Sequence, residues 1–199
     1  MPLLDDSIAL VSLEEAKRYL KIDPTVDDTS ADEFIETLVN AASKEIERLC
    51  NGRKFRKVTT AIDELFDGDD DADYYTKNAP ITGTPSLYYW DGLTWQTDSS
   101  WSTTQDNNAG RIWFDDGNVF WRGPIKNWKI SYTYGWTLND VPADLKEACI
   151  GLVALKKKLF DDGLHGVNSR SFGDQSISYT FDKIPANVLA TIYSYRRMR

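Results

Sequence analysis

The side chains with the clearest chemical potential are acidic, and seven of them fall within eleven positions. They are Asp63, Glu64, Asp67, Asp69, Asp70, Asp71 and Asp73. A calcium loop that starts at Asp67 would use Asp69 and Asp71 as ligands, but Ala72 then replaces the required glycine and Asn78 the bidentate glutamate. The pattern therefore favours a solvated turn between two strands, with adventitious divalent-ion binding or a partner contact as alternatives.

Histidine and cysteine offer few ligands or catalytic groups. The chain has one histidine, His165, and two cysteines, Cys50 and Cys149. These are too few for a zinc site or a disulfide framework, so we expect no metal, no cofactor, and cysteines buried as small apolar residues. The sequence lacks the motifs of serine hydrolases, P-loop nucleotidases and zinc proteases, which predicts a protein that is not an enzyme.

Charge is distributed unevenly along the 199 residues, whose net charge is −8. Residues 1–155 are net acidic and residues 156–199 net basic. Two ends of opposite charge suit a protein that docks a different partner at each end, although ends that are merely solvated differently would give the same pattern. The acidic body would repel nucleic acid.

The longest apolar run, residues 148–155, is too short to span a membrane. Asp5 and Asp6 are atypical of a signal peptide, so we expect a protein made and kept in a cytoplasm.

Capping signals predict two helices near the N-terminus. Ser12 followed by Glu15 opens a short helix over about residues 13–21. Ser30 followed by Glu33 opens a second helix over about residues 31–50, in which apolar residues recur at helical spacing.

Between residues 57 and 136 the helical period gives way to short β-prone segments separated by turn residues. The predicted strands cover residues 58–66, 73–76, 86–90, 111–114 and 128–136. All seven tryptophans lie between Trp90 and Trp136, so we expect aromatic rings to supply the core of this section. Flat rings also stack on sugars, which leaves a carbohydrate- or cell-surface-binding β module as an alternative function.

Helical spacing returns after Pro142 and predicts a third helix over about residues 143–160. Residues 163–183 form a glycine-rich loop that leads into one strand, and Pro185 opens a fourth helix to about Tyr195. The chain then ends in a short basic tail.

The predicted fold class is α+β. Residues 1–56 and 137–199 form a small helical bundle of about four helices, and residues 57–136 form an aromatic-rich antiparallel β section inserted between helices two and three. Tyrosine and arginine are favoured at protein interfaces, so the basic tail is the strongest remaining candidate for a binding site. The alternative is that the tail is a frayed, solvated terminus.

Five segments, in order, resemble the head-tail connector (adaptor, or head-completion) proteins of long-tailed bacteriophages. They are residues 11–23 (VSLEEAKRYLKID), the second helix and its exit within 34–55, residues 130–136 (ISYTYGW), residues 141–148 (VPADLKEA), and the C-terminal stretch with Gly166-Val167, Gly173-Asp174, Ser176 to Tyr179 and Tyr195 to Arg197. Residues 84–124 are longer and more aromatic than the family pattern.

The resemblance implies a non-enzymatic structural protein of the virion neck, made in the host cytoplasm. It implies a homo-oligomeric ring, twelve-fold on its portal, that joins the portal protein to the next neck or tail-completion protein, while genomic DNA passes through its channel without specific binding. Family analogy places the portal contacts at Tyr193, Tyr195, Arg196, Arg197 and Arg199. We also expect an assembly loop, which orders on docking, at Gly163, His165, Gly166, Arg170 and Gly173.

Overall fold

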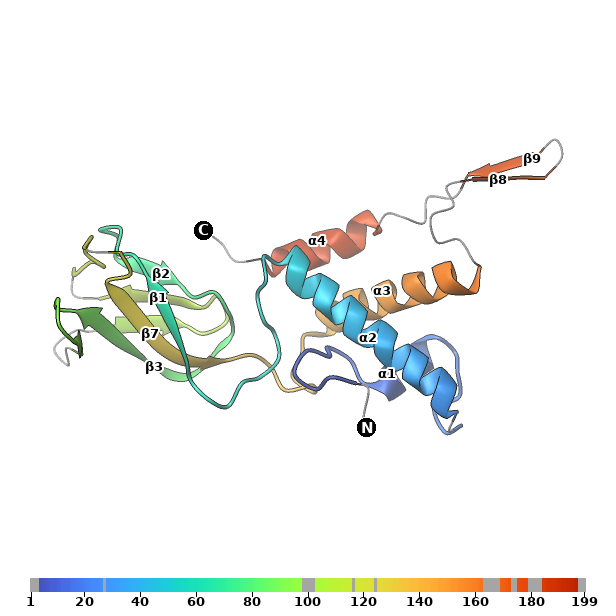
Figure 1. Cartoon of the computed structure of the whole chain (residues 1–199), viewed down its shortest axis with the longest axis horizontal. Coiled ribbons are helices and arrows are strands. Elements are labelled where there is room, and N and C mark those ends of the chain that lie inside the picture. Colours follow the sequence, from blue (N-terminus) through green and yellow to red (C-terminus); the bar gives the residue numbers. More distant parts are fainter. Residues whose placement is uncertain are drawn as a thin grey trace. The chain divides into compact units, whose positions relative to one another are not determined.

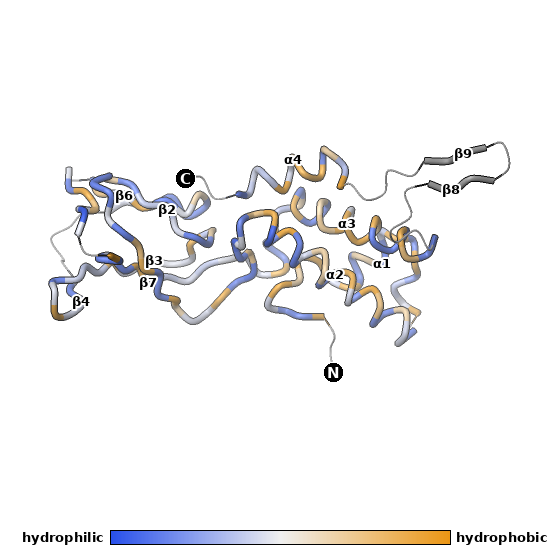
Figure 2. Tube along the Cα trace, turned by 45° about the horizontal axis from the view of Figure 1, so that its top comes forward, coloured by the Kyte–Doolittle hydropathy of each residue, from blue (hydrophilic) through white to orange (hydrophobic). Residues whose placement is uncertain are grey.

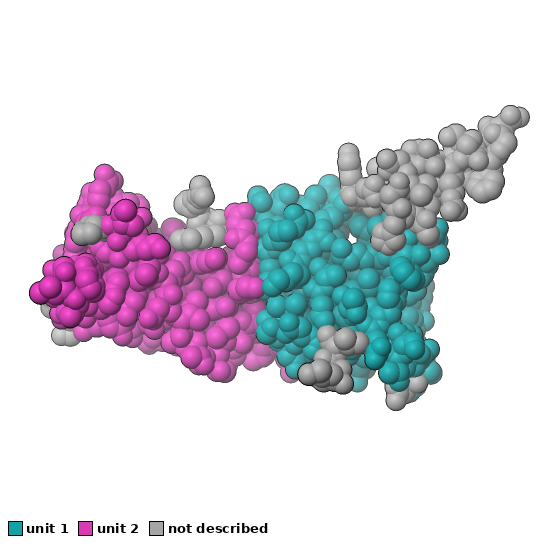
Figure 3. Space-filling view, in the orientation of Figure 1, with its two compact units in different colours: residues 1–50, 140–196 teal, residues 51–139, 197–199 magenta. Residues whose placement is uncertain are grey.

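The computed structural model describes residues 4–26, 28–97, 103–115, 117–123, 125–162, 169–172, 175–178 and 184–196 (Figure 1). In these residues the chain forms four helices and nine strands, which confirms the α+β class. The chain divides into two compact units, one built from Met1–Cys50 and Asp140–Arg196 and the other mainly from Asn51–Asn139 (Figure 3). Across the described ranges, no helix combines the length and the apolar character needed to span a membrane.

The first unit is a helical bundle. Its helices are α1 (Leu13–Tyr19), α2 (Thr29–Leu49), α3 (Ala143–Asp161) and α4 (Ala186–Ser194). Helix α3 packs against the other three, and α2 also contacts α1 and α4. Apolar residues recur along α2 and α3, visible as orange segments in Figure 2, and bury the faces that meet. The fully or almost fully buried residues of these two helices are Ile35, Val39, Ala42, Ile46, Leu145, Ala148, Cys149, Leu152 and Val153.

The ends of the first two helices show where capping signals succeed and fail. The predicted capping box of α1 is confirmed, because Ser12 Oγ accepts from the Glu15 N–H at 3.1 Å and the Glu15 carboxylate accepts from the Ser12 N–H at 2.8 Å. The predicted box at Ser30 is wrong. Asp28 caps α2 instead, since its carboxylate accepts from the Ala31 N–H at 3.2 Å, and Ser30 lies within the first turn.

Helix α1 ends at Tyr19 rather than at residue 21. Lys21 adopts the left-handed conformation, with φ of 58°, so the chain has already left the helix before Asp23-Pro24. Helices α3 and α4 lie within a residue of their predicted ends, with Pro142 and Pro185 just before their first residues.

The second unit contains two antiparallel sheets. Their strands are β1 (Ile62–Phe66), β2 (Asp73–Tyr75), β3 (Ile81–Trp90), β4 (Trp95–Gln96), β5 (Thr103–Asp106), β6 (Arg111–Phe114) and β7 (Trp128–Tyr134). The four-stranded sheet has the order β1-β7-β3-β4, and the three-stranded sheet has the order β2-β6-β5. Pairing of Ile62 with Tyr132 and of Ile81 with Tyr134 sets the register of β7 between its two neighbours.

Several strand boundaries depart from prediction. Strand β1 begins at Ile62 rather than at residue 58, because a bend at residues 59 and 60 precedes it, and glycine and proline displace the boundaries of two other strands. Strand β3 begins at Ile81 rather than at residue 86, because a register shift between Thr82 and Ser86 accommodates Gly83 and Pro85. Strand β7 ends at Tyr134 rather than at residue 136, since the next residue is a glycine with φ of 93°. Strands β4 and β5 were not predicted, because β4 has only two residues and the four polar residues of β5 carry no apolar alternation.

An aromatic core between the two sheets is confirmed. Its buried residues are Phe66, Ile81, Ile112, Phe114, Phe120, Trp128, Ile130, Tyr132 and Tyr134. The Trp128 ring lies edge-on to Phe120, with centroids 5.1 Å apart. Of the tryptophans in the described residues, only Trp128 is fully buried, so phenylalanine and tyrosine supply more of this core than expected.

A two-stranded hairpin, β8 (Ser169–Phe172) and β9 (Gln175–Ser178), follows α3 in the chain. The prediction of one strand over residues 176–181 is therefore wrong in number, and residues 179–181 lie outside the described residues. The sequence signal for the hairpin was the dipeptide Gly173-Asp174 between two short β-prone runs.

Candidate functional site

Three of the five predicted portal contacts lie in the last turn of α4 or directly after it. The Tyr195 hydroxyl donates to Asp144 Oδ1 on α3 at 2.6 Å, and Arg196 Nε donates to the backbone oxygen of Leu49 on α2 at 2.7 Å. Tyr193 remains 43% exposed and stacks against the Arg196 guanidinium, whose carbon lies 4.4 Å from the ring centroid. Arg197 and Arg199 lie outside the described residues.

These contacts satisfy groups that the helix ends leave unpaired. The carbonyl of Leu49 is one of the last four in α2 and therefore has no partner within that helix, so a cationic donor there also suits the helix dipole. Partial burial, followed by the hydrogen bond to Asp144 and its charge, raises the pKa of Tyr195 well above its usual value. The hydroxyl thus stays protonated and keeps donating throughout the physiological range.

A small cavity of about 220 Å³ lies between α3 and α4, next to this anchor. It is lined by Asp144, Glu147, Ala148, Asn187, Val188 and Thr191. The helices approach closely here, because a Cβ on Gly151 would lie at an ordinary contact distance of 3.7 Å from Val188. The polar lining and small volume suit a side chain or ordered water better than a cofactor.

The predicted assembly loop is described at one residue. Arg170 lies on β8, opposite Ile177 of β9. Gly163, His165, Gly166 and Gly173 lie outside the described residues.

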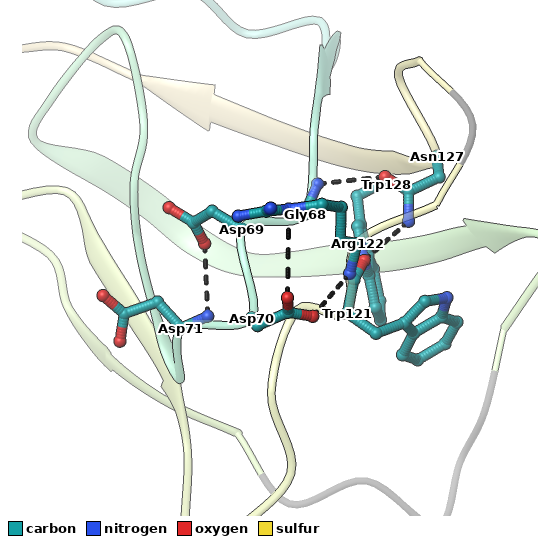
Figure 4. Close-up of polar contacts among 8 residues, drawn as sticks. All are labelled: Gly68, Asp69, Asp70, Asp71, Trp121, Arg122, Asn127 and Trp128. Atoms are coloured by element: carbon teal, nitrogen blue, oxygen red, sulfur yellow. Dashed lines mark hydrogen bonds and ion pairs between the residues drawn. The ribbon is translucent and has the colours of Figure 1, made fainter.

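The acidic segment forms the exposed turn between β1 and β2, as predicted (Figure 4). Asp70 Oδ1 accepts from the Arg122 backbone N–H at 2.8 Å, and Asp69 accepts from the Asp71 N–H at 3.3 Å. Asp70 thus holds the turn against Arg122, while Asp69 bonds within the turn itself. Among the described residues, no three histidine, cysteine, aspartate or glutamate side chains gather as a metal site would require.

Gly68 and Asn127 fasten this turn to the core. Asn127 is buried, accepts from the Gly68 N–H at 2.9 Å and donates to the Trp121 carbonyl at 2.8 Å. A Cβ at Gly68 would lie only 1.9 Å from that carbonyl oxygen, so glycine is required for the approach. The Trp128 indole N–H donates to the same oxygen at 3.2 Å.

Glu64 accepts hydrogen bonds from three protein groups, which its place in a charge cluster did not indicate. Its carboxylate accepts from the hydroxyls of Tyr74 at 2.7 Å and Tyr132 at 2.5 Å, and from the Lys77 N–H at 3.0 Å. Burial, then the charge of Glu64, raises the pKa of Tyr132 far above its usual value. The carboxylate therefore has a structural role that crosses from β1 to β7.

The cysteines and tryptophans take structural positions. Both cysteines are buried, as predicted, and burial raises the pKa of the Cys149 thiol to about 12, which keeps it neutral and poorly nucleophilic. Trp121 packs on Trp128 with centroids 4.3 Å apart, and the Arg111 guanidinium lies 4.6 Å from the Trp113 ring centroid. These rings contact protein groups rather than forming a flat open platform for sugars.

A family model described as "Head completion protein" matches residues 9–198. The chain belongs to the head completion protein family. The family resemblance seen in its sequence is thereby confirmed. No curated protein sequence matches this head completion protein at a significant level.

Solved structures share the fold of this head completion protein at low sequence identity. A chain titled as the neck of an empty GTA particle, computed with C6 symmetry, is 17% identical with a TM-score of 0.58, and the match covers 98% of this chain and 93% of that one. A chain from the neck of a native GTA particle, computed with C12 symmetry, is 16% identical with a TM-score of 0.55, covering 100% and 94%. A chain from the virion of a native gene transfer agent particle is 16% identical with a TM-score of 0.53, and the match covers 96% of this chain and 91% of that one.

Proposed function

We propose that this head completion protein is a structural, non-enzymatic component of a virion neck. The observation that carries the proposal is the family match over residues 9–198, joined to a fold shared with neck chains along almost the whole length of both proteins. Partner binding rather than catalysis is the function that such a chain performs.

The finer proposal is a ring that sits below the portal protein, continues the DNA channel and presents a surface to the next neck or tail-completion protein. The related neck structures were computed with six-fold and twelve-fold symmetry, which supports a cyclic assembly. A closed ring needs two different surfaces on each subunit that meet head to tail. A net charge of −8 favours passage of DNA without tight binding.

Among the predicted portal contacts, the proposal now separates two roles. Tyr195 and Arg196 bond to α3 and α2, so they position the C-terminal segment. Tyr193, which is 43% exposed, together with Arg197 and Arg199 in the following tail, are the proposed contacts with the portal.

The experiment is electron microscopy of the purified protein mixed with the cognate portal. An added ring with the symmetry of the portal is the expected result. An intact portal without added density, in the presence of folded protein, would contradict the proposal.

A charge-reversal pair tests the C-terminal contacts. The double variant Arg197→Glu with Arg199→Glu is expected to lose portal attachment while keeping its circular dichroism spectrum. The matched control is Arg18→Glu with Arg48→Glu, whose side chains are 69% and 73% exposed on α1 and α2. If both pairs attach equally well, the C-terminal arginines are not portal contacts.

A further inference from the structure

Strand β1 is the terminal strand of the four-stranded sheet, and β7 is the strand with which it pairs in the described part of the chain. An open groove of about 510 Å³ follows this edge. Its lining comprises Gly52, Lys54, Ile62, Asp63, Glu64, Leu65, Lys77, Asn78, Lys126 and Tyr134. Five residues of strand extend about 17 Å, which is long enough for a short segment to pair alongside.

The two acids in the groove already have partners on their own unit. Asp63 lies 3.5 Å from the Lys129 ammonium, measured between Oδ2 and Nζ. The Glu64 carboxylate accepts from Tyr74, Tyr132 and the Lys77 backbone. Lys129 therefore balances the charge of Asp63, whereas the donors of Glu64 are neutral and leave its negative charge in place.

The three lysines of the groove, Lys54, Lys77 and Lys126, outnumber its two carboxylates, and Lys129 already balances one of those carboxylates. Lys77 and Lys126 are exposed, and the ion pairs found among the described residues include neither ammonium group. Lys126 stands at the end of β1, where its backbone N–H donates to Asp67, and Lys77 stands beside the middle of the strand at Glu64. Positive charge is thus spaced along the edge rather than gathered at one point.

Leu65 adds an apolar contact on the same edge. Since Glu64 reaches the buried Tyr132, strand alternation directs Leu65 to the other face, where its side chain is 44% exposed. An unpaired backbone edge, an exposed leucine and flanking cations are the features that strand addition uses: main-chain bonds give affinity and alternate side chains give specificity.

We propose that the β1 edge binds an extended, acidic segment of a partner protein as an added β-strand. The acidic character follows from Lys77 and Lys126, which would each pair with a carboxylate on the added strand. The hairpin β8–β9 of a second copy is a poorer occupant, because its two strands, Ser169–Phe172 and Gln175–Ser178, contain Arg170 and no acid. The proposal concerns this unit alone and holds whether or not the protein forms a ring.

The test uses the full chain and two labelled octapeptides, one alternating valine with glutamate and one alternating valine with lysine. Fluorescence anisotropy is expected to detect binding of the glutamate peptide and none of the lysine peptide. Lys77→Glu and Lys126→Glu are each expected to weaken that binding by about fivefold, the scale of an exposed ion pair. The control is Lys57→Glu, an exposed lysine of the same unit outside the groove, which is expected to leave binding unchanged.

Hydrogen exchange of the β1 amides separates strand addition from simple charge attraction. With saturating glutamate peptide, the outward-facing amides of residues 62–66 are expected to exchange at least tenfold more slowly. Binding without that protection would overturn the proposal, as would equal binding of both peptides or an equal loss with Lys57→Glu. Preferential pairing of a synthetic β8–β9 peptide would replace the acidic partner by a second copy of the chain.

Discussion

Removing the hydroxyl of Tyr132 tests whether the network around Glu64 stabilises the β unit. Tyr132 is 2% exposed; its hydroxyl donates to Glu64 at 2.5 Å and accepts from the Asn78 N–H at 3.2 Å. In Tyr132→Phe the buried Asn78 N–H loses its acceptor and the carboxylate loses one donor. Leaving a buried group unsatisfied costs about 1–3 kcal/mol, so we expect the free energy of unfolding to fall by about 2 kcal/mol.

Urea unfolding followed by tryptophan fluorescence is the appropriate assay, because all seven tryptophans lie within this unit and report on it selectively. The control is Tyr88→Phe, which keeps the ring face that lies 4.3 Å from the Lys129 ammonium. If Tyr132→Phe lowered the unfolding free energy by less than about 0.5 kcal/mol, the hydroxyl network would be no more than a surface contact.

A double-mutant cycle with Glu64→Gln isolates the pair. The bond joins a phenol to a carboxylate, so the two substitutions are expected to be non-additive by about 1–2 kcal/mol. Additivity within about 0.3 kcal/mol would mean that Glu64 stabilises β1 through its other donors instead.

Three further predictions concern other positions. Gly68→Ala should destabilise the β unit by more than about 3 kcal/mol in the same urea assay, because the new Cβ would lie 1.9 Å from the Trp121 carbonyl oxygen. As a control, Gly151→Ala on a helix should leave stability equal or higher, because its Cβ would lie 3.7 Å from Val188. The Lys146 ammonium lies 2.7 Å from Glu15 Oε1. Burial alone would raise the pKa of Glu15, but the hydrogen bonds from Lys146 and Ser12 and the charge of Lys146 outweigh burial. The pKa of Glu15 is therefore lowered below 4.5. Glu15 therefore stabilises the helical unit above pH 4.5, by up to about 1 kcal/mol, and loses this effect as the pH falls through its folded-state pKa. Thermal unfolding by circular dichroism should show Glu15→Gln less stable than wild type at pH 7, with a difference that shrinks as the pH is lowered below 4.5; a constant difference would refute the linkage. Tyr195→Phe should lower the melting temperature of the helical unit by a few degrees without weakening portal attachment, and a selective loss of attachment would make Tyr195 a direct contact.

Local signals identified the elements whose formation depends on neighbouring residues in the chain. The Ser12–Glu15 box, the apolar stripe of α2 and the prolines before α3 and α4 place helices because caps and periodicity act within a few residues. Asp28 was missed as a cap because a second apparent box, Ser30–Glu33, follows two residues later, and the sequence does not rank the two.

Features that depend on tertiary pairing could not be obtained in this way. Strand β5 carries no apolar alternation and exists because β6 pairs with it. The bonds of Tyr195 to Asp144 and of Arg196 to Leu49 join residues 51 and 147 positions apart, so the basic tail looked uniform in sequence although two of its residues are anchors. The groove at β1 was hidden for the same reason, since its lysines come from three separate segments.

The chain order of the helical unit has a consequence for synthesis on the ribosome. Cys50, at the end of α2, donates its thiol to the carbonyl of Ile192, which is 142 residues later, and Ile192 is fully buried. At roughly 5–20 residues per second, the first helices wait roughly 7–30 s for α4 to emerge, while the contiguous β unit is already complete. Helix α3, which also packs on α2, emerges earlier in that interval, so a nascent chain stalled before α3 leaves the apolar side of α2 uncovered and is the form that most needs a chaperone.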